Sequence, residues 1–186
     1  MKKILLVLLC LSLNAQAIEV DGVVVNDGVH LGRSNLVLNG AGVSRKFIFD
    51  LYVVSLYLSA KKNSAMDVFS DTAEKRISLQ MLSDMSAEDM IYTFDKAIAK
   101  NNTDDELAAI RQEQHDFGTV FHKLGHVKKG DFILMDYLPG TGTQITINGA
   151  LRGTIKGAAF YTALLKIWLG DKPSDEELKL KLLGGK

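Results

Sequence analysis

The sequence contains one cysteine and two prolines among 186 residues, and its basic and acidic residues balance at 22 each. With Cys10 as the single cysteine, no intrachain disulfide can form, so the fold must depend on its apolar core. The lack of a basic excess argues against a nucleic-acid partner, which requires many positive side chains against its phosphates. Beyond residue 17, no apolar run approaches the length that spans a bilayer.

The most apolar segment lies at the N-terminus and has the three parts of a secretory signal peptide. Two lysines precede an apolar run at residues 4–13, and Ala15-Gln16-Ala17 supplies small residues at the two positions that a signal peptidase reads. A buried N-terminal helix is the less favoured alternative. We therefore predict a signal peptide at residues 1–17, export to the periplasm or the exterior, and one mature domain at residues 18–186.

Removal of the predicted signal peptide changes the composition of the mature protein. A lipoprotein anchor on Cys10 is disfavoured because the bulky Leu9 precedes it, so the mature chain would hold no thiol and no anchor. Loss of Lys2 and Lys3 from the 22 basic residues leaves 20 against 22 acidic residues. We expect a soluble, nearly neutral domain of unknown oligomeric state.

The apolar pattern predicts strands, two helices, further strands and two final helices. The helices should begin near Ser86, Thr103, Ala158 and Ser174, with Gly125 ending the second. Asn39-Gly40 reads as a turn that closes a short strand. The strands are expected at residues 23–25, 36–38, 47–58, 77–82, 131–137, 143–147 and 150–155. This order indicates an α+β fold in which helices pack against a largely antiparallel sheet.

No motif of nucleophilic catalysis or phosphate binding is present, and no cofactor is implied. His115, His122 and His126 are residue types that bind metals, but Gly125 interrupts their helical spacing and no further ligand completes a shell. We favour solvated or helix-terminal histidines over a metal site, and we assign no catalytic residue.

Arg45 directly precedes the long strand at residues 47–58, which we expect to be covered on both faces over much of its length. A guanidinium that enters a core needs an anionic partner, because an unpaired buried charge costs several kcal/mol. Arg45 could form the cationic end of an apolar pocket for a carboxylate such as a fatty acid. Alternatively, it pairs with Asp50 or a backbone carbonyl at the strand end. From the residues alone, we favour the pairing.

Five segments then carry a resemblance to a known family: residues 38–45, 52–58, 157–160, 167–171 and 182–184. They resemble the chalcone isomerase-like proteins, especially the bacterial exported branch of that family. The resemblance covers nearly the whole mature chain. It implies an open-faced antiparallel β-sheet with helices packed on one side, in agreement with the element order.

The plant enzymes of this family close a chalcone to a flavanone without a cofactor. By resemblance, their catalytic arginine corresponds to Arg45 and their strand threonine to Tyr52. The helical tyrosine, asparagine and threonine correspond to Met90, Ala97 and Ile167, which can neither orient a ketone nor transfer a proton. Only the arginine is retained, so the resemblance implies a protein that does not isomerise chalcones.

Non-catalytic proteins of this fold bind fatty acids through the arginine and a tyrosine. The resemblance therefore makes Arg45 and Tyr52 the expected ligand-binding residues, for a fatty acid or similar apolar carboxylate, with neither metal nor cofactor. Two alternatives stay open. One is a cofactor-independent isomerase or intramolecular lyase with Tyr52 as acid and base, and the other is a structural or partner-binding module.

Overall fold

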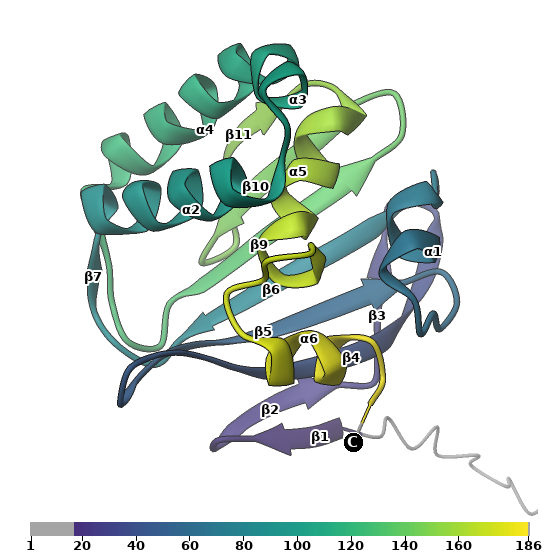
Figure 1. The fold of residues 1–186 in the computed structure, drawn as a ribbon. Helices are drawn as coiled ribbons and strands as arrows, with labels where there is room; N and C mark the ends of the chain where they lie inside the picture. The colour runs from purple at the N-terminus through teal and green to yellow at the C-terminus, as the bar shows by residue number, and fades with distance from the viewer. Residues whose placement is uncertain (1–16, 186) are drawn as a thin grey trace, which may run out of the picture.

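The centre of the protein is a curled, seven-stranded antiparallel sheet in the order β11-β10-β9-β6-β5-β4-β3 (Figure 1). The computed structural model describes residues 17–185, so Cys10 and all but the last residue of the predicted signal peptide lie outside the described residues. The strands of the sheet are β3 (Gly28–Leu31), β4 (Ser34–Lys46), β5 (Phe49–Leu58), β6 (Lys75–Met81), β9 (Phe132–Leu138), β10 (Gly142–Ile147) and β11 (Ala150–Ile155).

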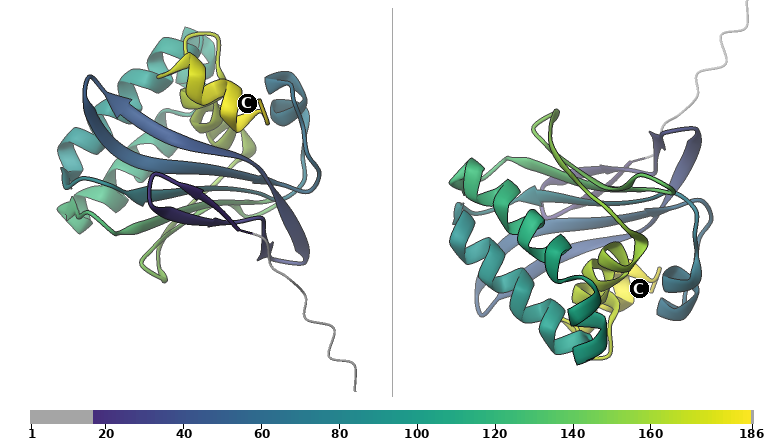
Figure 2. Two further views of the ribbon diagram at one scale, coloured as in Figure 1. Left: turned by 90° about the horizontal axis from the view of Figure 1, so that it is seen from below. Right: turned by 90° about the horizontal axis from the view of Figure 1, so that it is seen from above.

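Helices cover one face of this sheet, and a separate two-stranded hairpin lies against the other (Figure 2). The hairpin consists of β1 (Ala17–Val20) and β2 (Val23–Asn26), and a second strand pair joins β7 (Met85–Ser86) to β8 (His126–Val127). The helices are α1 (Ala65–Ser70), α2 (Ala87–Asn101), α3 (Asp104–Ala109), α4 (Arg111–Leu124), α5 (Ala158–Leu169) and α6 (Glu176–Leu182). The predicted α+β fold is confirmed.

Within residues 17–185, we find no helix with the length and apolar character needed to cross a bilayer.

The main core lies between the sheet and the helices, and aromatic side chains fill it. Phe94 of α2 stacks on Phe117 of α4 at a centroid distance of 5.7 Å and meets Trp168 of α5 edge-on at 5.9 Å. Such pairs contribute about 0.5–1.5 kcal/mol each beyond the area they bury. Alternate residues of β5, including Val54, Leu56 and Leu58, face these rings and are buried. We call this side of the sheet the helix-facing side.

A smaller core lies on the opposite side, which we call the outer side. Val23 and Val25 of the β1–β2 hairpin pack there against Val53 and Tyr57 of β5, together with buried residues of β3 and β4. Since successive side chains of a strand point to opposite faces, β5 contributes to both cores at once. The prediction of a strand covered on both faces is confirmed for residues 52–58, whereas Phe47 and Ile48 precede β5 and are exposed.

The predicted turn at Asn39-Gly40 is wrong, because β4 continues through both residues with an irregular register between Leu38 and Gly40. Asn39 is buried, and its side chain joins β4 to two other segments. Its amide donates to the carbonyl oxygens of Lys62 and Leu182 at 2.9 and 2.7 Å, and its oxygen accepts the Lys62 N–H at 2.7 Å. These bonds satisfy the polar groups that would otherwise favour a turn.

The expected single helix from Thr103 is two helices. A capping box between Thr103 and Glu106 starts α3 as predicted, but the chain leaves helical geometry at Ile110 and resumes as α4. The Ile110 side chain is buried in the main core, so the interruption between α3 and α4 coincides with a residue that is held by tertiary packing. Gly125 ends α4 with a positive φ of 80°, which confirms the predicted stop.

Gly40 is required because α6 packs directly on β4. A Cβ atom at this position would collide with the carbonyl oxygen of Lys181 and lie 2.8 Å from the Cα of Leu182. Gly40→Ala should therefore lower the free energy of unfolding by about 1–3 kcal/mol, as overpacking does elsewhere. Urea denaturation followed by circular dichroism measures this.

Gly118→Ala in α4 is the matched control, because its Cβ would meet only Ile91 Cγ2 at 3.8 Å. Removing a helical glycine should raise stability by about 1 kcal/mol. An equal decrease in the free energy of unfolding in both variants would contradict the proposed role of the close contact at Gly40.

Candidate functional site

Tyr52 lies on the helix-facing side, within the main core. Met90 and Ile167, which the sequence resemblance places in the family's active site, are buried in the same core, and Ala97 packs against it. All four positions thus lie in or against one core on the helix-facing side. The space around them is occupied by side chains, including those of Phe94 and Trp168.

The Tyr52 hydroxyl has polar neighbours in this apolar setting. Burial raises its pKa above the ordinary value, although Ser44 and Trp168 nearby act in the opposite direction. Ser44 is the direct cross-strand neighbour of Tyr52. The buried indole N–H of Trp168 makes no hydrogen bond of good geometry. Tyr52 is consequently a neutral phenol in the folded protein at physiological pH.

Arg45 lies elsewhere, at the open end of the β4–β5 hairpin. Its Nε donates to Asp50 Oδ1 at 2.6 Å, and 47% of its side chain is exposed. The register is irregular between Ser44 and Arg45, and Asp50, the partner of Arg45, lines a hollow on the outer side together with Val23. The structure therefore does not bring Arg45 and Tyr52 together, and the pairing of Arg45 with Asp50 expected from the residues alone is confirmed.

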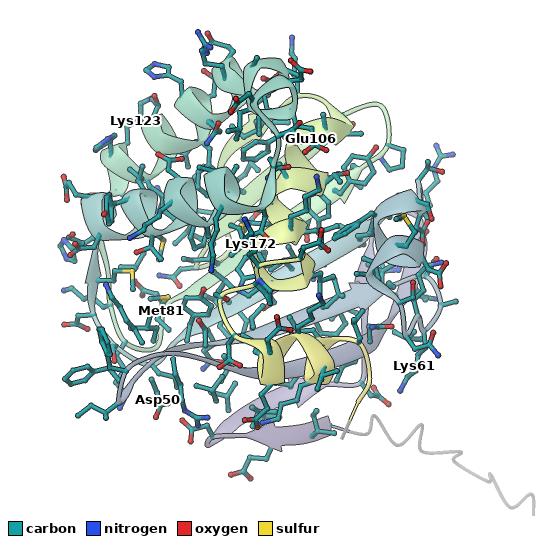
Figure 3. The ribbon with its side chains drawn as sticks, viewed as in Figure 1. Asp50, Lys61, Met81, Glu106, Lys123 and Lys172 are labelled. Carbon is teal, nitrogen blue, oxygen red and sulfur yellow. The ribbon has the colours of Figure 1, made fainter. Side chains whose placement is uncertain are left out.

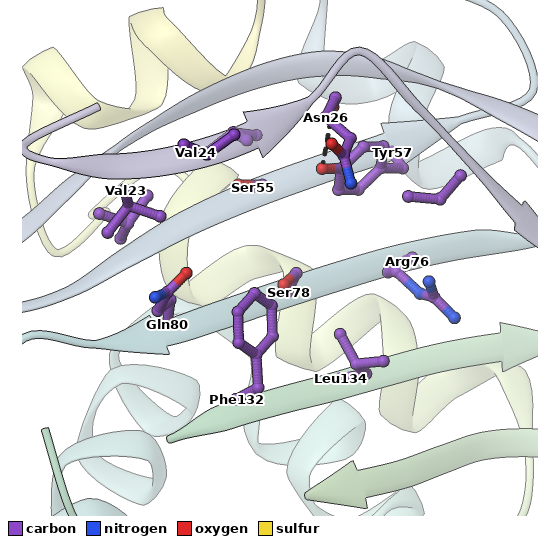
Figure 4. Close-up of a pocket in the computed structure, with 13 residues that line it drawn as sticks. Val23, Val24, Asn26, Ser55, Tyr57, Arg76, Ser78, Gln80, Phe132 and Leu134 are labelled. Atoms are coloured by element: carbon purple, nitrogen blue, oxygen red, sulfur yellow. Dashed lines mark hydrogen bonds between the residues drawn. The ribbon is translucent and has the colours of Figure 1, made fainter. Parts of the chain in front are cut away.

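An amphipathic groove lies on the outer side, between the β1–β2 hairpin and the sheet, with a cavity of about 190 Å³ (Figure 4). Its floor consists of three rows of cross-strand neighbours from β5, β6 and β9. From the polar end to the apolar end, the rows are Tyr57–Arg76, Ser55–Ser78–Leu134 and Val53–Gln80–Phe132, and Asp136 is the next cross-strand neighbour of Arg76 outside the lining. Val23, Val25 and Val29 complete the apolar wall.

Arg76 forms the cationic end of this groove. Its Nε and Nη2 donate to the two carboxylate oxygens of Asp136 at 2.5 and 2.7 Å, and these hydrogen bonds raise the pKa of Arg76. A two-point pair of this kind holds the guanidinium plane in one orientation. Nη1 makes no hydrogen bond to the described residues, so it retains donors for a ligand.

Tyr57 closes the polar end from the side of β5. Its hydroxyl donates to the carbonyl oxygen of Asn26 at the end of β2, at 3.1 Å, and so ties the hairpin to the sheet. Partial burial raises its pKa, while the neighbouring Arg76 lowers it. The oxygen of this neutral hydroxyl can also accept a hydrogen bond. Together, Arg76 and Tyr57 can bind a polar head group at one end of an apolar channel.

Sequence patterns alone do not identify Arg76 and Tyr57 as a pair. The clean alternation at residues 77–82 does indicate one polar face, and extending it backward by one residue adds Arg76 to that face. Ser55 and Tyr57 show the same period of two in β5. The missing information was the register between the strands, which places Tyr57 opposite Arg76.

Among the described residues, no three histidine, cysteine, aspartate or glutamate side chains form a group that could hold a metal ion. His122 Nδ1 lies 3.9 Å from a carboxylate oxygen of Glu88, on the exposed surface.

The two arginine–aspartate pairs should differ in their effect on stability. Arg76→Met leaves the Asp136 carboxylate buried without its partner, which should lower the free energy of unfolding by about 3 kcal/mol. Arg45→Met removes an ion pair that faces solvent, so its unfolding midpoint should remain close to that of the wild type. Urea titrations of both variants test this, and a larger loss for Arg45→Met would contradict the difference in burial.

Comparison with known proteins identifies the relatives of this chain. The family model described as chalcone isomerase-like matches residues 17–184. Among solved structures, the chain is similar to a fatty-acid binding protein of Arabidopsis thaliana, with a TM-score of 0.67 and 15% sequence identity. The similarity covers 90% of this chain and 96% of the plant protein. No curated protein matches the sequence.

Proposed function

Since the chain belongs to the chalcone isomerase-like family, we propose that it is a non-catalytic member that binds a fatty acid or a similar apolar carboxylate. The ligand occupies the groove on the outer side of the sheet. The observation that carries this proposal is the amphipathic lining of that groove, which is apolar along Val23, Val53 and Phe132 and cationic at Arg76. The plant fatty-acid binding protein of the same fold supports the ligand class.

Arg76 binds the carboxylate through the free donors on Nη1. Asp136 compensates most of the arginine charge, so the carboxylate is recognised through directed hydrogen bonds more than through net charge. Ser55 and Ser78 line the middle of the channel. The cavity of about 190 Å³ is smaller than the roughly 300–1,000 Å³ of most ligand pockets. A short or medium acyl chain fits this volume better than a long one.

The absence of catalysis is inferred from the positions that correspond to the plant active site. Met90 and Ile167 are buried apolar side chains, and Tyr52 has a raised pKa inside a filled core. A raised pKa keeps the Tyr52 hydroxyl protonated at neutral pH, so no phenolate is present to accept a proton.

The assignment of Arg45 and Tyr52 as ligand contacts stays a prediction. It would require Arg45 to leave Asp50 and the core around Tyr52 to open. Because Arg45 and Arg76 lie at different places on the protein, variants of the two residues separate this assignment from the groove.

Ligand binding can be tested by native mass spectrometry of the purified protein and by thermal shift with added lauric acid. We expect a bound fatty acid or a rise in Tm, because a ligand of the native state stabilises it. Arg76→Met combined with Asp136→Leu replaces the buried ion pair by apolar side chains, a change that is often neutral for stability. This double variant should bind at least about tenfold more weakly, since a hydrogen bond to a charged group contributes about 1.5–3 kcal/mol.

Two single variants complete this experiment. Ser78→Leu should block the channel while leaving the ion pair intact, and Arg45→Met should bind as the wild type does. Loss of binding in Arg45→Met alone would favour the site predicted from the sequence. A wild-type protein that is empty and gains no stability from fatty acids would refute the proposed function.

We also propose that the protein is exported and cleaved after Ala17. Ala17 is the first residue of β1, and cleavage there would leave Ile18, Glu19 and Val20 paired with β2. N-terminal sequencing of the protein from the extracytoplasmic fraction should begin at Ile18, and Ala15→Leu with Ala17→Leu should prevent processing. An unprocessed chain that remains in the cytoplasm would contradict this proposal.

A further inference from the structure

The β4–β5 hairpin ends in a turn made of large apolar residues. Phe47, Ile48 and Phe49 are 91%, 86% and 64% exposed. The turn projects at the left-hand edge of the molecule in the view of Figure 1, and its neighbour Asp50 is labelled there in Figure 3. Three adjacent apolar side chains at one convex tip differ from the single exposed apolar residues that most surfaces carry. We call residues 47–49 the apolar tip.

Local backbone geometry does not favour these residues. Phe47, the first central residue of the two-residue turn, has a φ of +58°, and Ile48 has no positive φ. This pattern resembles a type II′ turn, in which glycine is preferred at the first central position. A bulky residue with positive φ is strained. The hairpin would therefore fold more easily with glycine and a polar residue, so folding alone does not account for the apolar tip.

Positive side chains flank the apolar tip. Lys46 precedes it and lines a hollow on the helix-facing side, while Lys129 lines a hollow on the outer side together with Ile48 and Phe49. Acidic side chains lie beside the same two hollows. Asp50 pairs with Arg45, and Asp84 accepts the backbone N–H of Lys129 at 2.8 Å. Asp84 and Asp89 line the helix-facing hollow with Lys46, and Asp21 borders the outer hollow.

The outer hollow joins the apolar tip to the ligand groove. Val23 and Gln80 line both the hollow beside Ile48 and Phe49 and the groove that ends at Arg76. The apolar tip thus lies beside the outer hollow, the groove adjoins that hollow at Val23 and Gln80, and the cationic end lies at the far end of the groove.

We propose that the apolar tip inserts into the headgroup region of a lipid bilayer, with Lys46 and Lys129 beside the lipid phosphates. Three side chains are too few for a stable contact with a second copy, which buries about 20–30 residues on each side. Shallow insertion needs no extended complementary surface and strengthens with the apolar area and the basic charge presented. The hairpin pairs its own backbone, as an inserted segment requires.

Docking in this position would bring the mouth of the outer hollow to the membrane surface. An acyl ligand could then pass between the bilayer and the groove without crossing open water. This transfer step rests on the proposed function, whereas docking itself does not.

Docking is tested by co-sedimentation of the purified protein with vesicles of phosphatidylcholine alone or mixed equally with phosphatidylglycerol. The wild type should bind, and more tightly to the anionic vesicles. Phe47→Gly with Ile48→Ser supplies favoured type II′ residues, so it should raise Tm while lowering the partition coefficient at least about tenfold. Lys46→Gln should weaken binding to the anionic vesicles only. Leu151→Ser, which removes another exposed apolar residue on β11, is the control and should bind normally.

Absence of wild-type binding, or equal binding by Phe47→Gly/Ile48→Ser, would overturn the docking proposal. A wild-type dimer in sedimentation velocity that this double variant abolishes would instead assign the apolar tip to self-association, and would also overturn it.

Transfer is measured separately, from the rate at which a pyrene-labelled fatty acid moves from vesicles to protein. The double variant should slow this rate at least about tenfold without changing the affinity in vesicle-free solution. A protein that binds vesicles but no fatty acid would refute the proposed function and leave docking intact. Equal transfer rates with unchanged affinity would refute the membrane-loading step.

Discussion

The alternation of side chains along β5 and β6 is the constraint on which the organisation of this protein depends. From Tyr52 to Leu58 and from Ile77 to Met81, every second residue faces the helices and belongs to the main core. The residues between them face the β1–β2 hairpin and include Ser55, Tyr57 and Ser78. A strand can change this assignment only by a shift of register, which would reverse both faces at once. The sheet therefore separates a filled core from an amphipathic groove.

This separation explains why residues close in sequence do not form a common site. Arg45 and Tyr52 lie near each other along the hairpin, but they belong to opposite sides of the sheet, and Arg45 is satisfied by Asp50. On the helix-facing side, aromatic packing between α2, α4 and α5 occupies the space around the positions that correspond to the plant active site. On the outer side, small polar residues and the narrow hairpin leave a cavity.

Local signals predicted much of the fold. The caps at Ser86 and Thr103 and the stop at Gly125 act within a single turn of helix, so the residues alone identify them. The continuation of β4 through Asn39 was missed because the partners of that side chain are distant in sequence. One of them, Leu182, is 143 residues away. A turn propensity depends on residues that are near in sequence, so it does not include hydrogen bonds to such distant partners.

The site was less predictable for the same reason. The period of two in β6 indicates a polar face, but the role of Arg76 depends on Asp136, which is 60 residues away and adjacent only through the β6–β9 pairing. The resemblance to the family predicted the sheet and helices correctly, and it implied that Arg45 is the ligand-binding arginine. The register between strands, which no short motif encodes, determines that Arg76 lines the groove and that Arg45 does not.

A crystal structure with a bromine-labelled fatty acid would locate the ligand on one side of the sheet or the other. We expect an anomalous bromine peak on the outer side, in the apolar part of the groove near Val53 and Phe132, with the carboxylate in hydrogen-bond range of Arg76 Nη1. A peak on the helix-facing side beside Tyr52 and Trp168, with the groove empty, would contradict this placement.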